Sequence, residues 1–191
     1  LFIGDEFFKS PKSSFPQKKL DIIFETEDLL AVNKPSGMKS QPDGPCDNAL
    51  SEYIKGYLYD KGEYDPEDGH SFAPAICNRL DVNTSGIVLA AKNAETLRFL
   101  NEKVKNKEIE KYYRCIVCGT PPKESDILTG YILKDRKKNR SVIKKEEGPG
   151  SKFVKTGYKV LRSHMGRSLL DITLYTGRSH QIRAHMAAVG C

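Results

Sequence analysis

Hydrophobic positions recur along the first half of the chain with two periods, which predict a strand hairpin followed by a helix. Two apolar runs, residues 22–24 and 29–32, are separated by a polar turn and indicate the hairpin. Asp47 and Asn48 can then cap a helix. Its apolar positions recur at helical spacing, at Leu50, Tyr53, Ile54, Tyr57 and Leu58.

The pattern after the middle of the chain predicts one more helix and then mostly strands. Asn93 can cap a helix that carries Leu97, Leu100 and Val104 on one face. Strand-like segments follow at residues 112–117, 127–133, 153–161 and 169–176. The last segment alternates, with Leu170, Ile172 and Leu174 opposite more polar positions, so one of its faces is expected to be buried.

The final element, residues 176–190, predicts a strand end followed by a helix. Ser179 can cap the helix and Gly190 can stop it. An apolar stripe on this helix includes Ile182 and leaves Arg183 on another face. A cation beside a buried carboxylate would keep that carboxylate ionised, although a surface arginine is the simpler alternative.

A polar loop, NRLDVNTSG at residues 78–86, leads directly into the apolar run 87–91. Arg79 and Asp81 lie two residues apart, so in an extended backbone both side chains can face one cleft. A loop that ends on a buried strand is a frequent place for reactive groups. The alternative is that Asp81 caps a local turn and Arg79 is a solvated neighbour.

Charge adds a candidate partner to this picture. The chain of 191 residues has a net charge of +6 and suits one domain. Residues 134–145 hold seven basic residues and one acid, and the rest of the chain is balanced at 24 of each. This basic run favours a polyanion, nucleic acid first, with Lys137, Lys138 and Arg140 as candidate contacts. A solvated hairpin is the alternative.

Five scattered cysteines favour a reducing compartment, and we expect a cytoplasmic protein. Cys115 and Cys118 are three apart in a strand-like stretch, which sends them to opposite faces, so no metal site is expected. No apolar run is long enough for a membrane span. The chain starts at Leu1 and stops at Cys191 after a helix-like run, so we expect a piece of a longer polypeptide.

Four motifs together resemble the successive motifs of the RluA family of pseudouridine synthases. They occur in the family's order and are NKPSG at 33–37, NRLDVNTSGIVLAAK at 78–92, KYYRCIVCG at 111–119 and TGRSHQIRAHMAAVG at 176–190. The resemblance implies an α+β fold whose mixed, mostly antiparallel central sheet is flanked by helices and loops around one catalytic cleft. It also implies an enzyme that isomerises selected uridines in structured RNA to pseudouridine, without cofactor or metal.

The resemblance also implies roles for individual residues. Asp81 matches the catalytic carboxylate, and Arg79 matches the arginine that extrudes the target uridine and takes its place. Arg183 matches the arginine paired with that carboxylate. Tyr113 matches the aromatic residue that packs on the flipped uracil, and Ile182 lines the pocket. Asp81 could act as nucleophile, base or electrostatic stabiliser, and the sequence does not choose among them.

The sequences of the motifs most resemble those of the branch that modifies large-subunit ribosomal RNA, with transfer RNA as the alternative substrate. This implies that residues 1–19 are a linker and the tail of a preceding small RNA-binding domain. Residues 20–191 would be the catalytic domain, incomplete at its C-terminus and monomeric. Asn78 replaces a frequent histidine of the family, so we expect it to support the loop rather than to act as an acid or base.

Two other function classes stay open at this point. The first is an RNA-binding module that kept the fold and lost catalysis; the presence of Asp81, Arg79, Tyr113 and Arg183 favours the enzyme. The second is a small-molecule glycosidase. It is disfavoured because only one carboxylate stands out, whereas that chemistry normally uses a pair.

Overall fold

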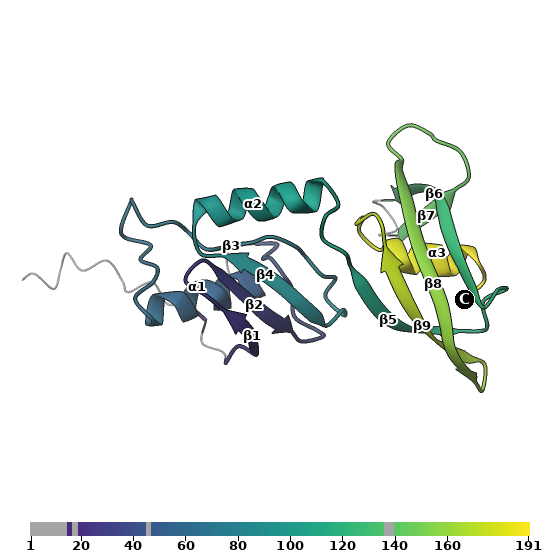
Figure 1. Cartoon of the computed structure of the whole chain (residues 1–191), viewed down its shortest axis with the longest axis horizontal. Helices are drawn as coiled ribbons and strands as arrows, with labels where there is room; N and C mark the ends of the chain where they lie inside the picture. Colours follow the sequence, from purple (N-terminus) through teal and green to yellow (C-terminus); the bar gives the residue numbers. More distant parts are fainter. Residues whose placement is uncertain (1–14, 17–18, 45–46, 136–139) are drawn as a thin grey trace, which may run out of the picture. The chain divides into compact units, whose positions relative to one another are not determined.

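The structure is a computed structural model that describes residues 15–16, 19–44, 47–135 and 140–191 (Figure 1). The chain divides into two compact units, Leu1–Glu102 and Lys103–Cys191, which we call the N-terminal and C-terminal units. Each unit contains its own antiparallel sheet. None of the helices in the described part of the chain is long and apolar enough to cross a membrane.

The sheet of the N-terminal unit is built around the predicted hairpin. β1 (Ile22–Glu25) pairs antiparallel with β2 (Leu29–Lys34). β4 (Gly86–Ala91) pairs with the other edge of β2, and the short β3 (Ala75–Ile76) pairs with β4. The order of the described strands is therefore β1-β2-β4-β3, with the two longest strands in the centre.

Helix α1 (Leu50–Asp60) supplies much of the core of this unit. Its residues Leu50, Ile54 and Leu58 recur every four positions and are at most 1% exposed, packed with strand residues such as Val88. Fully burying an aliphatic side chain of this size contributes about 1.5–3 kcal/mol. The apolar positions that predicted the helix are thus the ones that pack it against the sheet.

The described strands of the C-terminal unit form a second sheet in the order β5-β9-β8-β6-β7. All four pairings in this order are antiparallel. The strand bounds are β5 (Tyr112–Cys118), β6 (Ser125–Asp135), β7 (Arg140–Lys144), β8 (Lys152–His164) and β9 (Arg167–Leu174).

Helix α3 (Gln181–Ala188) covers one face of the second sheet. Met186 of the helix packs with Leu170, Ile172 and Tyr158, which are at most 4% exposed. Because strand residues alternate, their neighbours form the opposite surface, which we call the outer face. The outer face includes Tyr112, Arg114, Ser125, Ile127, Gly157, Lys159, Asp171 and Thr173.

The α+β class, the hairpin and the predicted strands are confirmed. The expected single mixed sheet is, in the described residues, two sheets in which all neighbouring strands are antiparallel. Asp47 does not cap α1: its carboxylate binds Lys39, and Ala49 occupies the cap position. Asn93 does cap helix α2 (Ala94–Lys105), accepting the Thr96 N–H at 2.8 Å.

Two expectations fall partly or wholly on residues that the structure does not describe. The proposed tail of a preceding domain lies within residues 1–14, outside the described range. The basic run forms a hairpin as expected, β6 to β7, but its tip with Lys137 and Lys138 is outside the described residues. Only the backbone of Arg140 is described. These three residues therefore remain predicted RNA contacts.

Candidate active site

The loop that carries Arg79 and Asp81 runs from the end of β3 to the start of β4 in the N-terminal unit. Asn78 attaches its first part to β4. The side-chain amide of Asn78 donates to the Ile87 carbonyl at 3.1 Å and accepts the Leu89 N–H at 2.8 Å. Asn78 thus holds the loop against the strand, which is the supporting role expected from the sequence.

The backbone just before Asp81 is fixed by a buried serine from another segment. Ser40, 5% exposed, accepts the Leu80 N–H at 3.0 Å and donates its hydroxyl to the Leu80 carbonyl at 2.9 Å. Both polar groups of the Leu80 backbone are therefore satisfied by the Ser40 hydroxyl. The next residue in that segment, Gln41, accepts a hydrogen bond from the exposed guanidinium of Arg79 at 3.3 Å.

The backbone just after Asp81 is fixed by a buried lysine. Lys34 is fully buried, and its ammonium donates to the carbonyls of Pro35 at 3.0 Å, Met38 at 2.7 Å and Val82 at 3.1 Å. The Val82 carbonyl also accepts the Gly37 N–H at 2.8 Å. Burial lowers the pKa of Lys34, while the negative charge of Asp81 acts in the opposite direction.

The remainder of the loop is a turn that also contacts the NKPSG segment. The Thr84 N–H donates to the backbone carbonyl of Asp81 at 3.0 Å, and the Ser36 hydroxyl donates to the Asn83 carbonyl at 3.1 Å. Gly86 ends the turn with φ of +135°, a conformation that strongly favours glycine. Asp81, half-buried, is therefore presented by a backbone held at several points on either side.

The residues expected to bind the uracil lie in the C-terminal unit. Tyr113 on β5 pairs with Ile172 on β9 and packs, half-buried, against the core of that unit. Ile182 on α3 packs against the same core. Arg183 follows it in the helix and is exposed. Tyr113 and Ile182 thus belong to one apolar cluster, with Arg183 adjacent in sequence.

A buried glutamine sets the start of α3. Gln181, 2% exposed, accepts the Thr176 hydroxyl at 2.9 Å and the Arg178 N–H at 3.1 Å. Its amide donates to Thr156 Oγ1 at 2.8 Å. The predicted cap at Ser179 is wrong, because the cap position falls on His180, whose φ is +57°. The Gln181 side chain, rather than a serine hydroxyl, hydrogen-bonds to the backbone just before the helix.

The candidate residues therefore form one group in each unit. Arg79 and Asp81 share a loop in the first unit, and Tyr113, Ile182 and Arg183 share a strand and helix in the second. Their convergence on one cleft stays a prediction. Within the described part of the chain, no group of three or more His, Cys, Asp or Glu residues could hold a metal ion.

Sequence reasoning missed the residues that support Asp81 and α3, namely Lys34, Ser40 and Gln181. One signal was available for Lys34. Leu30, Val32 and Lys34 alternate on β2, so the ammonium of Lys34 had to share the buried face of the two apolar residues. Ser40 and Gln181 carry no comparable pattern, because their partners come from distant segments.

The chain is similar to known RNA pseudouridine synthases. The family model for RNA pseudouridylate synthase matches residues 28–188. An uncharacterized RNA pseudouridine synthase of Chlorobaculum parvum is 36% identical over 90% of this chain and 52% of the relative. A protein of Borreliella burgdorferi named ribosomal large subunit pseudouridine synthase D is 35% identical over 86% of this chain and 50% of the relative. The chain thus spans about half the length of these curated relatives.

A solved structure shows the same fold. Human RNA pseudouridylate synthase domain containing 1 superposes with a TM-score of 0.71 at 22% identity, covering 92% of this chain and 68% of that chain. The four motifs noted in the sequence all lie within or beside the span of the family match. The chain belongs to the RNA pseudouridylate synthase family.

Proposed function

We propose that this chain is the catalytic part of an RNA pseudouridine synthase that isomerises selected uridines in structured RNA. The observation that carries the proposal is the Asp81 loop, whose backbone is held by Ser40 before the aspartate and by Lys34 after it. A carboxylate that must act on one glycosidic bond needs this kind of preorganised support. A solvated surface turn does not.

The proposed mechanism begins with extrusion of the uridine, because a stacked base hides the bond to be cut. Arg79 would fill the vacated space, and Tyr113 would stack on the flipped uracil. Cleavage of the glycosidic bond builds positive charge on the sugar, which Asp81 would stabilise, capture or relieve by taking a proton. The base then turns and rejoins the sugar through carbon 5, which loses its proton. Arg183 would keep Asp81 ionised.

The proposed substrate is large-subunit ribosomal RNA, with transfer RNA as the alternative. It is supported by the names of relatives from Borreliella burgdorferi and Zymomonas mobilis, both ribosomal large subunit pseudouridine synthase D. The basic run at 134–145 would contact phosphates, and the protein would act in the cytoplasm as a monomer. Replacing Lys137, Lys138 and Arg140 should reduce the salt dependence of RNA affinity. An unchanged slope would assign the run to an ordinary solvated hairpin.

Release of tritium from RNA labelled at uracil carbon 5 tests the activity directly, because only reattachment through that carbon expels its hydrogen. We expect release by the chain, none by Asp81→Ala, and RNA binding by both. Asp43→Ala is a matched control, since Asp43 is an exposed carboxylate of the same unit. Retained activity in Asp81→Ala would remove that residue from the mechanism. Binding without release by the unmodified chain would favour the RNA-binding module.

A further inference from the structure

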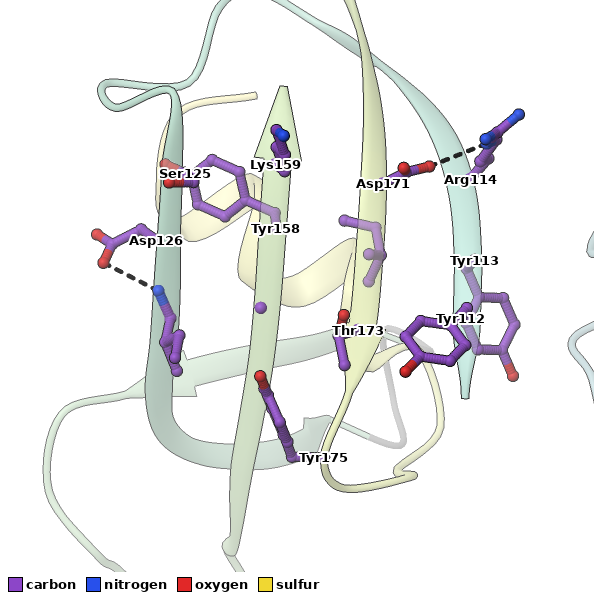
Figure 2. Close-up of a pocket in the computed structure, with 13 residues that line it drawn as sticks. Tyr112, Tyr113, Arg114, Ser125, Asp126, Tyr158, Lys159, Asp171, Thr173 and Tyr175 are labelled. Carbon is purple, nitrogen blue, oxygen red and sulfur yellow. Dashed lines mark hydrogen bonds and ion pairs between the residues drawn. The ribbon is translucent and has the colours of Figure 1, made fainter. Parts of the chain in front are cut away.

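The outer face of the second sheet contains a shallow hollow of about 900 Å³, which strands β5, β6, β8 and β9 line (Figure 2). The strand register arranges its side chains in two rows. The first row is Tyr112, Thr173, Gly157 and Ile127, and the second is Arg114, Asp171, Lys159 and Ser125. The first row is uncharged and includes an aromatic ring, while three of the four residues in the second row are charged. Helix α3 lies behind the opposite face.

Gly157 makes room in the floor of the hollow for a tyrosine ring. A Cβ atom at this position would lie 3.3 Å from the ring of Tyr175, which follows β9. The ammonium of Lys155 lies 4.7 Å from the centroid of the same ring, within the range of a cation–π contact. The Tyr175 side chain therefore lies across the sheet instead of standing away from it, with 42% of its surface exposed.

Tyr112 provides a second ring at the edge of the hollow. It is 66% exposed, yet its hydroxyl donates to the carboxylate of Glu110 at 2.8 Å, which holds the ring in place. This hydrogen bond raises the pKa of Tyr112, and the nearby Tyr175 acts in the same direction. Two exposed aromatic rings thus line the same hollow on one sheet face.

Cations outnumber carboxylates around these rings, even with the Glu110 carboxylate on the Tyr112 hydroxyl included. Arg114 pairs with Asp171 at 2.9 Å, and Lys123 pairs with Asp126 at 2.9 Å. Among the described residues, no carboxylate lies within ion-pair distance of Lys155 or Lys159. Exposed rings flanked by uncompensated cations are the combination that binds single-stranded nucleic acid. The rings stack with bases of any sequence while the cations attract phosphates.

We propose that this hollow binds an unpaired segment of the substrate RNA, with bases stacked on Tyr112 and Tyr175 and phosphates near Lys155 and Lys159. A base on Tyr175 would replace the Lys155 ammonium on that ring and leave the ammonium to contact a phosphate. The identity of the RNA rests on the proposed function, but the binding does not depend on catalysis. Tyr113, the candidate uracil contact, also lines the hollow along β5, but its side chain alternates with that of Tyr112 and packs against the core on the other face. The hollow would hold RNA that flanks the modified uridine.

Fluorescence anisotropy with labelled decauridylate tests this surface, with a self-complementary RNA duplex as the second probe. We expect Tyr112→Ala and Tyr175→Ala each to weaken decauridylate binding about tenfold, as lost base stacking does, and to leave duplex binding nearly unchanged. Tyr112→Phe and Tyr175→Phe keep the rings and should keep most of the affinity. Ile116→Ala is the matched control, since Ile116 is 71% exposed on the same strand but does not line the hollow.

Two further variants test the floor and the charges. Gly157→Val should weaken decauridylate binding, because its side chain would displace the Tyr175 ring. Replacing Lys155 and Lys159 by glutamine should lower the slope of log affinity against log salt by about 1.4, at roughly 0.7 per phosphate contact on a single strand. Circular dichroism and urea unfolding identify variants that have lost the fold, and the tyrosine variants are judged only where both match the wild type.

The proposal is overturned if the folded double variant Tyr112→Ala/Tyr175→Ala binds decauridylate as well as the wild type. It is also overturned if sedimentation shows a dimer of the chain that these two substitutions dissociate, because a second copy would then occupy the hollow. Failure of the proposed function is distinguishable. If the wild type releases no tritium but the double variant loses decauridylate binding, the RNA-binding hollow is supported and the proposed enzyme activity is not. If the wild type releases tritium and the double variant still binds decauridylate, the activity is supported and the hollow is rejected.

Discussion

Replacing Lys34 by methionine tests whether the Asp81 loop depends on the buried ammonium beneath it. Methionine keeps most of the side-chain volume and removes the three hydrogen bonds. The Val82 carbonyl would keep the Gly37 N–H at 2.8 Å, but the carbonyls of Pro35 and Met38 would lose the Lys34 donor. Leaving a buried polar group unsatisfied costs about 1–3 kcal/mol.

The expected loss of stability is smaller than the summed cost of leaving two carbonyls unsatisfied. Burial lowers the pKa of Lys34 because the charged ammonium is disfavoured inside the protein. Removing that charge therefore relieves a desolvation penalty, which offsets part of the lost hydrogen bonding. We therefore expect the loop to lose about 2–4 kcal/mol of local stability. Because Val82 follows Asp81 directly, the carboxylate should lose its fixed position as well.

Amide hydrogen exchange followed by NMR measures this loss locally. Exchange at the Gly37 N–H, which donates to Val82, and at the Thr84 N–H should become about 30-fold to 1,000-fold faster. Lys39→Met is the matched control, since Lys39 lies in the same segment but forms only partly exposed ion pairs with Asp43 and Asp47. Unchanged exchange at Gly37 in folded Lys34→Met would refute the argument that Lys34 fixes the loop.

Two pH effects follow from other buried or paired groups. Burial raises the pKa of Glu25, but hydrogen bonds from Lys61, Lys92 and Tyr57 lower it to about 2, so this carboxylate stabilises the fold above its ordinary pKa of 4.5 and loses that contribution as pH falls toward 2. Glu25→Gln should thus lower the urea midpoint at neutral pH and lose its effect near pH 2. Burial lowers the pKa of His185 from 6.5, so stability should fall as pH drops below 6.5, and the melting temperature of His185→Gln should depend less on pH in that range.

The sequence predicted the elements that repeat a simple period. The alternation at Leu170 and Ile172 and the helical spacing of Leu50, Ile54 and Leu58 identify buried faces without any knowledge of the partner segments. Turn residues and the Asn93 cap are equally local, because each involves neighbours within a few positions. Local signals of this kind are sufficient for strands, helices and the class of fold.

The supports of the site could not be predicted in the same way. Ser40 binds the backbone of Leu80 forty positions away, and Gln181 at the start of α3 binds Thr156 on β8. Each is a polar residue in an irregular or terminal segment, where sequence patterns predict exposure. Burial of such residues is possible only because a distant backbone or hydroxyl satisfies their hydrogen bonds, and that pairing exists only in the folded chain.

The two adjacent tyrosines of β5 show how much depends on one residue of register. The pairing of Tyr113 with Ile172 directs Tyr113 toward the core against which Ile182 packs, and it leaves Tyr112 on the outer face next to Thr173. A slip of one residue would exchange the two rings, because side chains alternate across a strand. The family resemblance assigned Tyr113 to the uracil by the spacing of its motif, and that assignment stays a prediction. The strand register places the Tyr112 ring on the opposite face of β5, so the two proposed RNA contacts are separable by single substitutions on neighbouring residues.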